Sequence, residues 1–417
     1  MGKSRLSSKE RGRLDILSKV KLGVLTLVKA AALLSVSYRQ IRRVYKRYLA
    51  EGSEGLKHGL RDHVSNHRID LERRARILDL YSSKYEDFGP TLAVEYLCEV
   101  DGETLSEETL RRWLIEAGVW HVRTRGSVHR KWRERREYWG ELIQMDGSEH
   151  DWFEGRRAKA SLMVMIDDAT NWTHAKFFES ETTVAAMSVF EEYVGYYGLP
   201  LALYVDRDAI YKTTRDSTVD ETLANQMPLT QFGRAMSELD VDLILANSSQ
   251  AKGRVERRHQ VFQDRLVKAM RLEKIGSLES ANAFLERNFL DSMNNKFHVE
   301  ARSPANVHRK LRREINLRHV LCYREERVVQ NDWTVSWCNR FFQLDEAHHK
   351  LSLAKKAIEV NELLDGTIRL VYRGKELQWR ELVERVPAIN KKRPPTTPTK
   401  PPYKPAANHP WRGKGKR

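Results

Sequence analysis

The chain has 417 residues, and 73 Lys and Arg against 57 Asp and Glu give it a formal net charge of +16. With 41% hydrophobic and 31% charged residues it can form several cores, which excludes wholesale disorder. No apolar run reaches the roughly 18 residues that span a bilayer. Three widely spaced cysteines, Cys98, Cys322 and Cys338, exclude a disulfide framework. We therefore expect a multidomain protein of the cytoplasm whose positive charge favours nucleic acid as partner, before an anionic membrane surface.

The charge is distributed unevenly along the sequence. Residues 1–140 carry a net +10, residues 141–240 a net −10, residues 241–390 a net +7 and residues 391–417 a net +9. A metal-dependent phosphoryl-transfer site requires such an acidic segment within a DNA-binding chain, because carboxylates hold the cations. Chance fluctuation of local charge is the alternative explanation.

Two helical segments open the chain. Residues 8–50 have the spacing of three helices, and the third carries basic side chains around an apolar stripe: Arg39, Arg42, Arg43, Lys46 and Arg47. This predicts a helix-turn-helix domain over residues 1–60 whose third helix binds DNA; a helical hairpin with a solvated basic face is the alternative. Residues 66–120 predict a second helix-turn-helix domain, and residues 121–138 a basic linker, either along DNA backbone or solvated.

The middle of the chain changes to an α/β pattern. We expect strands at residues 141–147, 159–167, 173–178, 201–205 and 241–246, and helices at residues 182–197, 229–239 and 251–271. Three antiparallel strands extended by two parallel ones make a ribonuclease H-like core, predicted over residues 139–315. Short strand candidates within residues 320–385 predict a small β-barrel. Residues 390–417 are rich in Pro and Lys and predict a disordered basic tail.

Three carboxylates are distinguished by their positions on these elements. Asp146 lies at the end of the first strand, Asp206 at the end of the fourth, and Glu256 early in the last helix. The two strands are adjacent in this architecture, so their ends meet where open α/β sheets bind ligands. Together the carboxylates could hold two Mg²⁺ ions about 3.5–4 Å apart for an in-line phosphoryl displacement. An exposed helix with i,i+4 charge pairs is the alternative for Glu256.

Other carboxylates lie near the same strand ends: Asp151, Asp167, Asp168 and Asp208. Asp167 and Asp168 precede a turn and suit the end of a strand better than a metal site. Asp208 is a further candidate ligand.

The segments QMDGSEHDWFEGR, YVDRDAIYKT and NSSQAKGRVERRHQVFQDRL resemble the DDE transposase and retroviral-integrase superfamily. More narrowly, the chain looks like bacterial insertion-sequence transposases of the ISNCY kind, over most of its length. The resemblance implies that Asp146, Asp206 and Glu256 are catalytic ligands for two Mg²⁺ ions, which Mn²⁺ can replace. Lys252 matches the family's phosphate-contacting lysine, and we expect DNA contacts from it and from the basic residues beside it: Arg254, Arg257 and Arg258.

The resemblance also implies a function. Such a transposase binds the terminal inverted repeats of a mobile element, hydrolyses a phosphodiester to free a 3′-OH and joins that hydroxyl to target DNA. Double-stranded DNA and other copies of the chain, as a dimer or a larger synaptic complex at the bacterial nucleoid, are the expected partners. A non-catalytic helix-turn-helix regulator with a decayed core, and a nuclease without strand transfer, are the alternatives.

Two departures from the family pattern concern the second aspartate. Arg207 and Asp208 follow Asp206 where many relatives have Asn-Gly. The interval from Asp206 to Glu256 is 50 residues, longer than in retroviral integrases, and an insertion around residues 213–227 would explain it.

Overall fold

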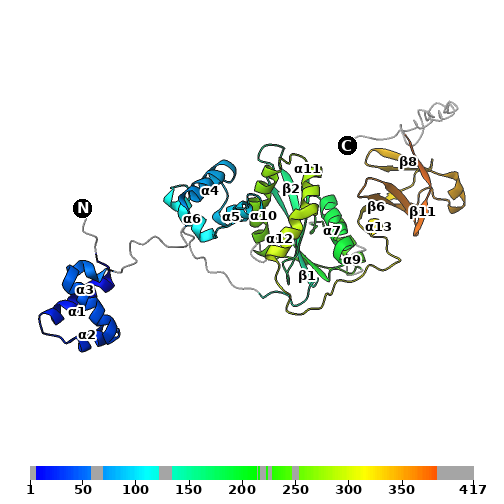
Figure 1. Ribbon diagram of the computed structural model, residues 1–417. Helices are drawn as coiled ribbons and strands as arrows, with labels where there is room; N and C mark the ends of the chain where they lie inside the picture. The colour runs from blue at the N-terminus through cyan, green and yellow to red at the C-terminus, as the bar shows by residue number, and fades with distance from the viewer. Residues whose placement is uncertain are drawn as a thin grey trace, which may run out of the picture. The chain divides into compact units, whose positions relative to one another are not determined.

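The computed structural model describes residues 6–57, 69–121, 134–213, 215–216, 222–223, 228–246 and 253–382 (Figure 1). The chain divides into two compact units, residues 1–125 and residues 126–417. The described residues do not include Lys252 or the basic tail. They also leave out most of the predicted linker and most of the predicted insertion. No helix in the described ranges is both long and apolar enough to cross a membrane.

The first unit begins with a three-helix bundle. It contains α1 (Ser8–Lys21), α2 (Leu27–Leu33), α3 (Tyr38–Glu51) and the 3-10 turn η1 (Gly52–Leu56). Ser7 and Glu10 form a capping box at the start of α1, and Ser37 caps α3. The buried core consists of Leu17, Ala30, Ala31, Ile41, Val44 and Leu56. The three predicted helices are confirmed.

A second helical bundle follows in the same unit. It contains α4 (Leu71–Lys84), α5 (Pro90–Glu99) and α6 (Glu107–Glu116). Pro90 begins α5, where a missing N–H costs no intrahelical bond, and Ser106 caps α6. Glu103, in the loop before α6, accepts hydrogen bonds from Arg73 and Arg76 of α4. These contacts tie the loop to α4 and confirm the second predicted helical unit.

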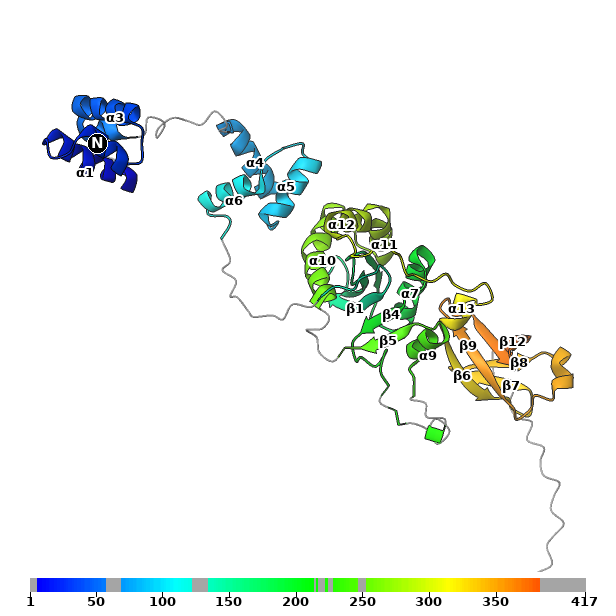
Figure 2. The same ribbon diagram turned by 90° about the horizontal axis from the view of Figure 1, so that it is seen from below.

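The second unit is built on a five-stranded sheet in the order β3-β2-β1-β4-β5 (Figure 2). The strands are β1 (Leu142–His150), β2 (Ala160–Asp167), β3 (Thr173–Phe178), β4 (Ala202–Val205) and β5 (Asp242–Leu245). The pairs β1–β2 and β2–β3 are antiparallel, whereas β1–β4 and β4–β5 are parallel. This is the predicted arrangement of three antiparallel strands extended by two parallel ones.

Helices cover both faces of this sheet, as Figures 1 and 2 show. One face packs against α7 (Thr183–Tyr197) and α9 (Gln231–Glu238). The other packs against α10 (Gly253–Leu272), α11 (Leu278–Phe284), the π-helical turn η3 (Leu285–Phe289) and α12 (Leu290–Phe297). Met163 and Met165 of β2 point to the first core, and Leu162 and Val164 to the second. All eight residues of β2 are buried because both faces are covered.

The C-terminal part of the second unit is a small β-module. Its elements are α13 (Leu317–Val320), β6 (Cys322–Val328), β7 (Thr334–Trp337), β8 (Arg340–Leu344), η4 (Glu346–Leu351), β9 (Ala357–Leu363), β10 (Ile368–Tyr372), β11 (Lys375–Leu377) and β12 (Trp379–Leu382). The strands form a β11-β10-β9-β6 sheet and a β12-β8-β7 sheet around one hydrophobic core. The predicted all-β module is confirmed; closure into a barrel is not, because no pairing among the described strands joins the two sheets.

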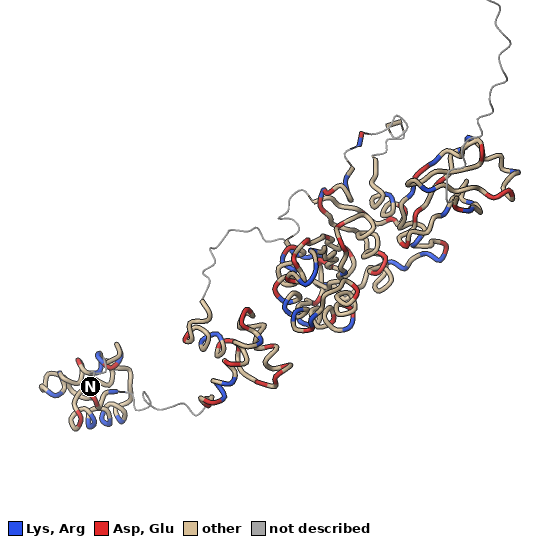
Figure 3. The backbone as a smooth tube through the Cα atoms, turned by 90° about the horizontal axis from the view of Figure 1, so that it is seen from above, with Lys and Arg blue, Asp and Glu red and all other residues tan. Residues whose placement is uncertain are grey.

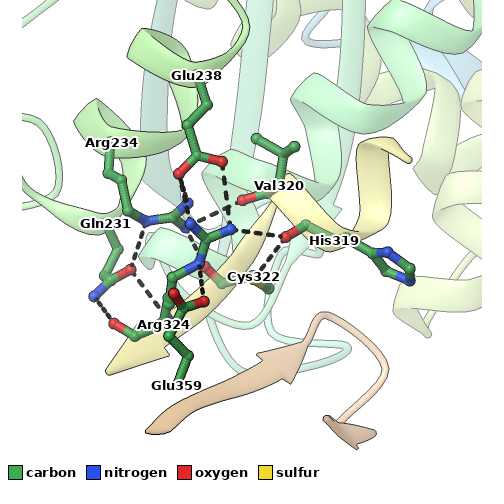
Figure 4. A network of polar contacts seen from close by, with 8 residues as sticks. All are labelled: Gln231, Arg234, Glu238, His319, Val320, Cys322, Arg324 and Glu359. Atoms are coloured by element: carbon green, nitrogen blue, oxygen red, sulfur yellow. Dashed lines mark hydrogen bonds and ion pairs between the residues drawn. The ribbon is translucent and has the colours of Figure 1, made fainter. Parts of the chain in front are cut away.

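A polar network fastens this module to α9 of the α/β core (Figure 4). The Gln231 side chain donates to the Arg324 carbonyl at 2.7 Å and accepts from the Arg324 backbone N–H at 3.1 Å. Arg234 donates to the Cys322 carbonyl at 2.7 Å. Glu238 Oε1 pairs with both arginines, at 2.8 Å each. Because Cys322 begins β6, these bonds hold the first strand of the module against the core.

Candidate active site and DNA-binding surface

Strand register brings Asp146 and Asp206 to the same level of the sheet. In the parallel β1–β4 ladder, Leu142 pairs with Ala202 and Gln144 with Tyr204, partners that are 60 positions apart. Asp206 directly follows β4 and lies the same 60 positions after Asp146. The ladder, continued by two residues, therefore places the two carboxylates side by side.

Strand alternation also fixes the face on which both aspartates lie. Ile143 of β1 and its partner Leu203 of β4 belong to the core under α7 and α9. Side chains alternate along a strand, so Asp146 and Asp206 face the opposite side of the sheet, which α10 covers. Both are partly buried. The predicted adjacency of β1 and β4 is confirmed, but the predicted end of the first strand is wrong: β1 continues to His150, so Asp146 lies within the strand rather than at its end.

Helix α10 runs along β1 in the same direction and in step with it. The Val255 N–H lies 3.4 Å from Gln144 Oε1, His259 Nδ1 lies 3.8 Å from Asp146 Oδ2, and Gln263 Nε2 donates to Ser148 Oγ at 3.2 Å. Four helical residues rise about 6 Å and two strand residues about 6.6 Å, so successive turns meet successive residues of one strand face. The contacts between α10 and β1 therefore stay in register over two helical turns, with Asp146 in the middle.

Glu256 lies on this helix three residues before His259, which contacts Asp146. Its side chain is exposed, whereas Val255 and His259 beside it are buried against β1. In the described ranges, no three His, Cys, Asp or Glu side chains are gathered closely enough to hold a metal ion. The assignment of Asp146, Asp206 and Glu256 as metal ligands therefore stays a prediction. Their chemistry fits it, because Mg²⁺ takes carboxylate oxygens.

Asp168 and Asp167 are internal parts of the fold. Asp168 Oδ1 accepts hydrogen bonds from Gln144 Nε2 and from Arg254 Nε, both at 2.7 Å. Asp167 accepts from the Gly140 N–H at 2.9 Å, and burial raises its pKa. Asp168 thus ties the first turn of α10 to β1, which supports the prediction that both residues belong to the strand end rather than to the metal site.

Asp208 belongs to the turn after β4. Its N–H donates to Asp206 Oδ1 at 2.9 Å, and its own carboxylate accepts from the Ile210 N–H at 3.0 Å. This turn orients the Asp206 carboxylate and keeps the exposed Asp208 near it. Asp151 has a similar local role, since it accepts from the Gly155 N–H.

Sequence reasoning did not single out two further residues near these strand ends, Glu181 and Tyr211. A Cβ added to Gly147 would lie 2.1 Å from Glu181 Oε2, so the Glu181 carboxylate lies over Gly147, on the α7 and α9 face of the sheet and opposite to the face of Asp146. Burial raises the pKa of Tyr211 well above its ordinary value, and nearby carboxylates add to the shift: Glu181, Asp206, Asp146 and Asp208. The only sequence signal was position, since each follows a strand end by a few residues.

The predicted DNA contacts on α10 differ in their surroundings. Arg254 is bound to the buried Asp168. Arg258 is buried, lies over the Phe297 ring and donates to the Asn171 carbonyl, and desolvation lowers its pKa to about 10. Arg257 is exposed. Only Arg257 of these three is therefore placed at the surface, where DNA could reach it.

The four predicted DNA contacts on α3 are all exposed: Arg39, Arg42, Arg43 and Lys46. Ile41 and Val44 on the opposite side of the helix enter the bundle core. Arg43 and Lys46 line a groove of about 750 Å³ together with Arg47, with Arg13 of α1 and with Lys57. Figure 3 shows Lys and Arg around this bundle. The amphipathic pattern of the sequence thus produces a basic exposed helix face.

Comparisons with known proteins agree with these features. A helix-turn-helix domain family matches residues 13–62, and a homeodomain-like domain family matches residues 40–114. The chain is 38% identical over 382 residues to the putative transposase y4bF of Sinorhizobium fredii, which covers 91% of this chain and 82% of the relative. It is 29% identical over 445 aligned positions to the transposase for insertion sequence IS1202 of Streptococcus pneumoniae. This match covers 95% of this chain and 92% of the relative.

Solved structures of retroviral proteins are also similar. The catalytic core domain of HTLV-2 integrase, in complex with magnesium, matches 36% of this chain and 86% of its own at 17% identity and a TM-score of 0.28. A chain of the simian T-cell lymphotropic virus intasome, in complex with PP2A regulatory subunit B56 gamma, matches 74% of this chain and 100% of its own. The identity is 13% and the TM-score is 0.33.

Helix-turn-helix domains followed by an α/β core place the chain in the class of DNA-binding transposases, together with these relatives. The chain belongs to the family of these bacterial transposases, since it is 38% identical to one of them over most of the length of both chains.

Proposed function

We propose that this chain is a transposase that binds the ends of a mobile element, frees a 3′-OH by hydrolysis and joins it to target DNA. The observation that carries the proposal is the register that places Asp146 beside Asp206 on the face covered by α10. Glu256, one turn from the helix residue that contacts Asp146, supplies the third carboxylate. Double-stranded DNA and at least one further copy of the chain are the proposed partners, because two element ends must be paired.

Each residue of the site has a proposed task. Asp146, Asp206 and Glu256 hold two Mg²⁺ ions, which activate the attacking oxygen and stabilise the leaving oxygen when bound. The Asp208 turn orients Asp206, and the Asp168–Arg254 bond holds the start of α10 in place. The exposed basic face of α3 holds the DNA end, with Arg257 near the reacting strand.

The proposed reaction consists of two displacements at phosphorus. In the first, a water oxygen bonds to the phosphorus at the element end, the bond from phosphorus to the 3′-oxygen breaks, and that oxygen takes up a proton. In the second, the freed 3′-OH bonds to a target phosphorus and loses its proton, the bond from that phosphorus to the target 3′-oxygen breaks, and this oxygen takes up a proton. No protein nucleophile is needed.

Asp206→Asn tests the proposal. The substitution keeps the size of the side chain but removes the charge, so we expect unchanged binding of end DNA and cleavage reduced on the order of 100- to 1,000-fold. The assay uses a strand-labelled end duplex with Mg²⁺ and follows nicked and joined products. Asp151→Asn is the control, because Asp151 is exposed and its hydrogen bond to Gly155 is retained by Asn.

The same assay separates the rival functions. Wild-type cleavage by Asp206→Asn would contradict the assigned site. A wild-type chain that binds ends but never nicks them would indicate the non-catalytic regulator. Nicking without any joined product would indicate a nuclease.

A further inference from the structure

Gln144 is a polar side chain at a fully buried position of β1, two residues before Asp146 and on the same face of the sheet. Its Nε2 donates to Asp168 Oδ1 at 2.7 Å. Its Oε1 accepts a long hydrogen bond of 3.4 Å from the Val255 N–H. One side chain therefore joins β1, the turn after β2 and the first turn of α10.

Asp168, which is also fully buried, connects Gln144 to two further segments. Its Oδ1 also accepts from Arg254 Nε of α10, at 2.7 Å. Its Oδ2 accepts from the Arg136 backbone N–H at 2.9 Å, in the segment that leads into β1. Hydrogen bonds to an ionised carboxylate are shorter and stronger than those between neutral groups. Asp168 is thus a fixed point to which the entry segment, β1 and α10 are all attached.

This network ends beside Glu256, the third carboxylate of the proposed site. Glu256 directly follows Val255, whose N–H bonds to Gln144. Asp146 follows Gln144 by two residues in β1. The hydrogen bonds therefore link the strand that carries the first carboxylate to the helical turn that carries the third.

The choice of an amide at this position needs a reason other than stability. Burying an amide costs free energy that its hydrogen bonds offset, so an apolar side chain of the same size would stabilise the fold about as well. Hydrogen bonds, however, fix distance and direction, and a bonded polar network makes a core rigid and unique. Gln144 thus determines where α10 begins relative to β1, which apolar contacts alone leave less closely defined.

We propose that Gln144 and Asp168 are positioning residues of the proposed active site: together they hold the first turn of α10, and with it Glu256, at a fixed place beside β1. The inference rests on the proposed function. Both side chains are fully buried, so they act through Glu256 rather than on DNA. A reacting group displaced by about 1 Å can slow a reaction on the order of 100-fold, so a small movement of this turn is sufficient.

Gln144→Met in the full chain tests the proposal. Met has a similar size but makes neither hydrogen bond, and Asp168 keeps its bonds to Arg254 and to the Arg136 N–H. The assay measures single-turnover cleavage of a labelled end duplex with Mg²⁺ over a range of DNA concentrations. We expect the rate constant at saturating DNA to fall roughly ten- to a hundredfold. The half-saturating DNA concentration should stay at the wild-type value, because the basic face of α3 is unchanged.

Hydrogen exchange gives a second measurement on the same variant. Exchange should become faster over residues 253–259, the start of α10, and stay unchanged in β2. Asp168→Asn provides the same test if Gln144→Met does not fold, because Asn keeps the size and one acceptor oxygen but loses the charge that binds Arg254. We expect the same loss of rate at an unchanged half-saturating DNA concentration.

Asn294→Leu is the matched control. Asn294 is also a buried amide with two hydrogen bonds, since it accepts from the Thr173 N–H and donates to the Thr173 carbonyl, both at 2.8 Å. These bonds join α12 to β3 rather than α10 to β1. The control should unfold at a lower temperature and, while folded, cleave at the wild-type rate. If Gln144→Met behaves in the same way, Gln144 is structural and the inference is wrong.

Asp206→Asn distinguishes the two levels of failure. If it loses cleavage while Gln144→Met cleaves at the wild-type rate, the positioning role falls and the proposed site stands. If Asp206→Asn cleaves like the wild type, the proposed function falls together with the inference.

Discussion

At the scale of single residues, the fold uses buried polar groups to fix segments far apart in sequence. The partly buried His308 has such a role: it lies above Gly140, its Nε2 is hydrogen-bonded with the Tyr193 hydroxyl, and its Nδ1 lies 2.6 Å from Asn306 Oδ1. Gly140 has a φ of +87°, and a Cβ there would lie 2.4 Å from His308 Nδ1, so only glycine fits. This contact holds the strand-like segment around residue 308 against the start of β1.

His308 makes the stability of the core dependent on pH. Desolvation lowers the pKa of His308 from 6.5 to about 4. Between these values the unfolded chain binds a proton that the folded chain does not, so the free energy of unfolding falls as pH is lowered from about 6.5 to about 4. We expect a loss on the order of 1–3 kcal/mol, and urea unfolding at pH 7 and pH 5 measures it.

His308→Phe should reduce this pH dependence. The control His298→Phe, at an exposed histidine, should retain it. Equal pH dependence in wild type and His308→Phe would contradict the assignment to His308.

Some residues near the strand ends can be predicted from the sequence and others cannot, because their positions have different physical causes. Asp146 and Asp206 follow from strand order, because alternation and register are properties of the chain pattern. Glu181 and Tyr211 depend on contacts between elements distant in sequence, which no local pattern encodes. Arg257 and Arg258 are adjacent and chemically alike, yet one is exposed and the other buried. Helical spacing alone does not tell which of the two arginines is buried. That depends on which face of α10 packs against the sheet.

At the scale of elements, the attachment of β6 to α9 decides how firmly the β-module is held. Sequence patterns predict strands close to β7, β8, β9 and β10, but the candidate at residues 327–330 overlaps only the end of β6, and the short β11 and β12 have no predicted counterpart. The attachment itself depends on side chains of α9 that reach backbone carbonyls, as in the bond from Arg234 to Cys322. Such a bond has no sequence signature, because an arginine on a helix surface most often faces solvent.

Arg234→Met tests this attachment. The substitution keeps much of the apolar stem but leaves the carbonyls of Val320 and Cys322 without the arginine donor, while Glu238 keeps Arg324; the loss should cost about 1–3 kcal/mol. Hydrogen exchange should then become faster over residues 320–328 and stay unchanged in β1 and β2. Arg318→Met is the control, because Arg318 contacts Glu191 at 3.4 Å with a side chain that is 72% exposed. Unaltered exchange over residues 320–328 in Arg234→Met would show that the apolar contacts alone hold the module.

At the scale of the whole molecule, the two compact units divide the proposed work. The first unit carries the exposed basic face of α3, and the second carries the aspartates of the acidic site. The net +10 of residues 1–140 and the net −10 of residues 141–240 follow the same division. DNA binding and phosphoryl transfer should therefore be separable by substitution.

The double variant Arg43→Ala and Lys46→Ala tests this separation. Both side chains are exposed and line the basic groove of the first bundle, so each is expected to contact a phosphate. Loss of two such contacts should weaken binding of end DNA about tenfold or more and should lower the slope of log affinity against log salt by about 2. Mn²⁺ affinity should stay at the wild-type value, because the acidic site is untouched.

The control removes the same charge from α1 with Lys9→Ala and Arg11→Ala, both exposed and outside the groove. If the two double variants weaken DNA binding equally, net charge rather than the α3 face determines the interaction, and the assignment of α3 as the DNA-binding helix is wrong.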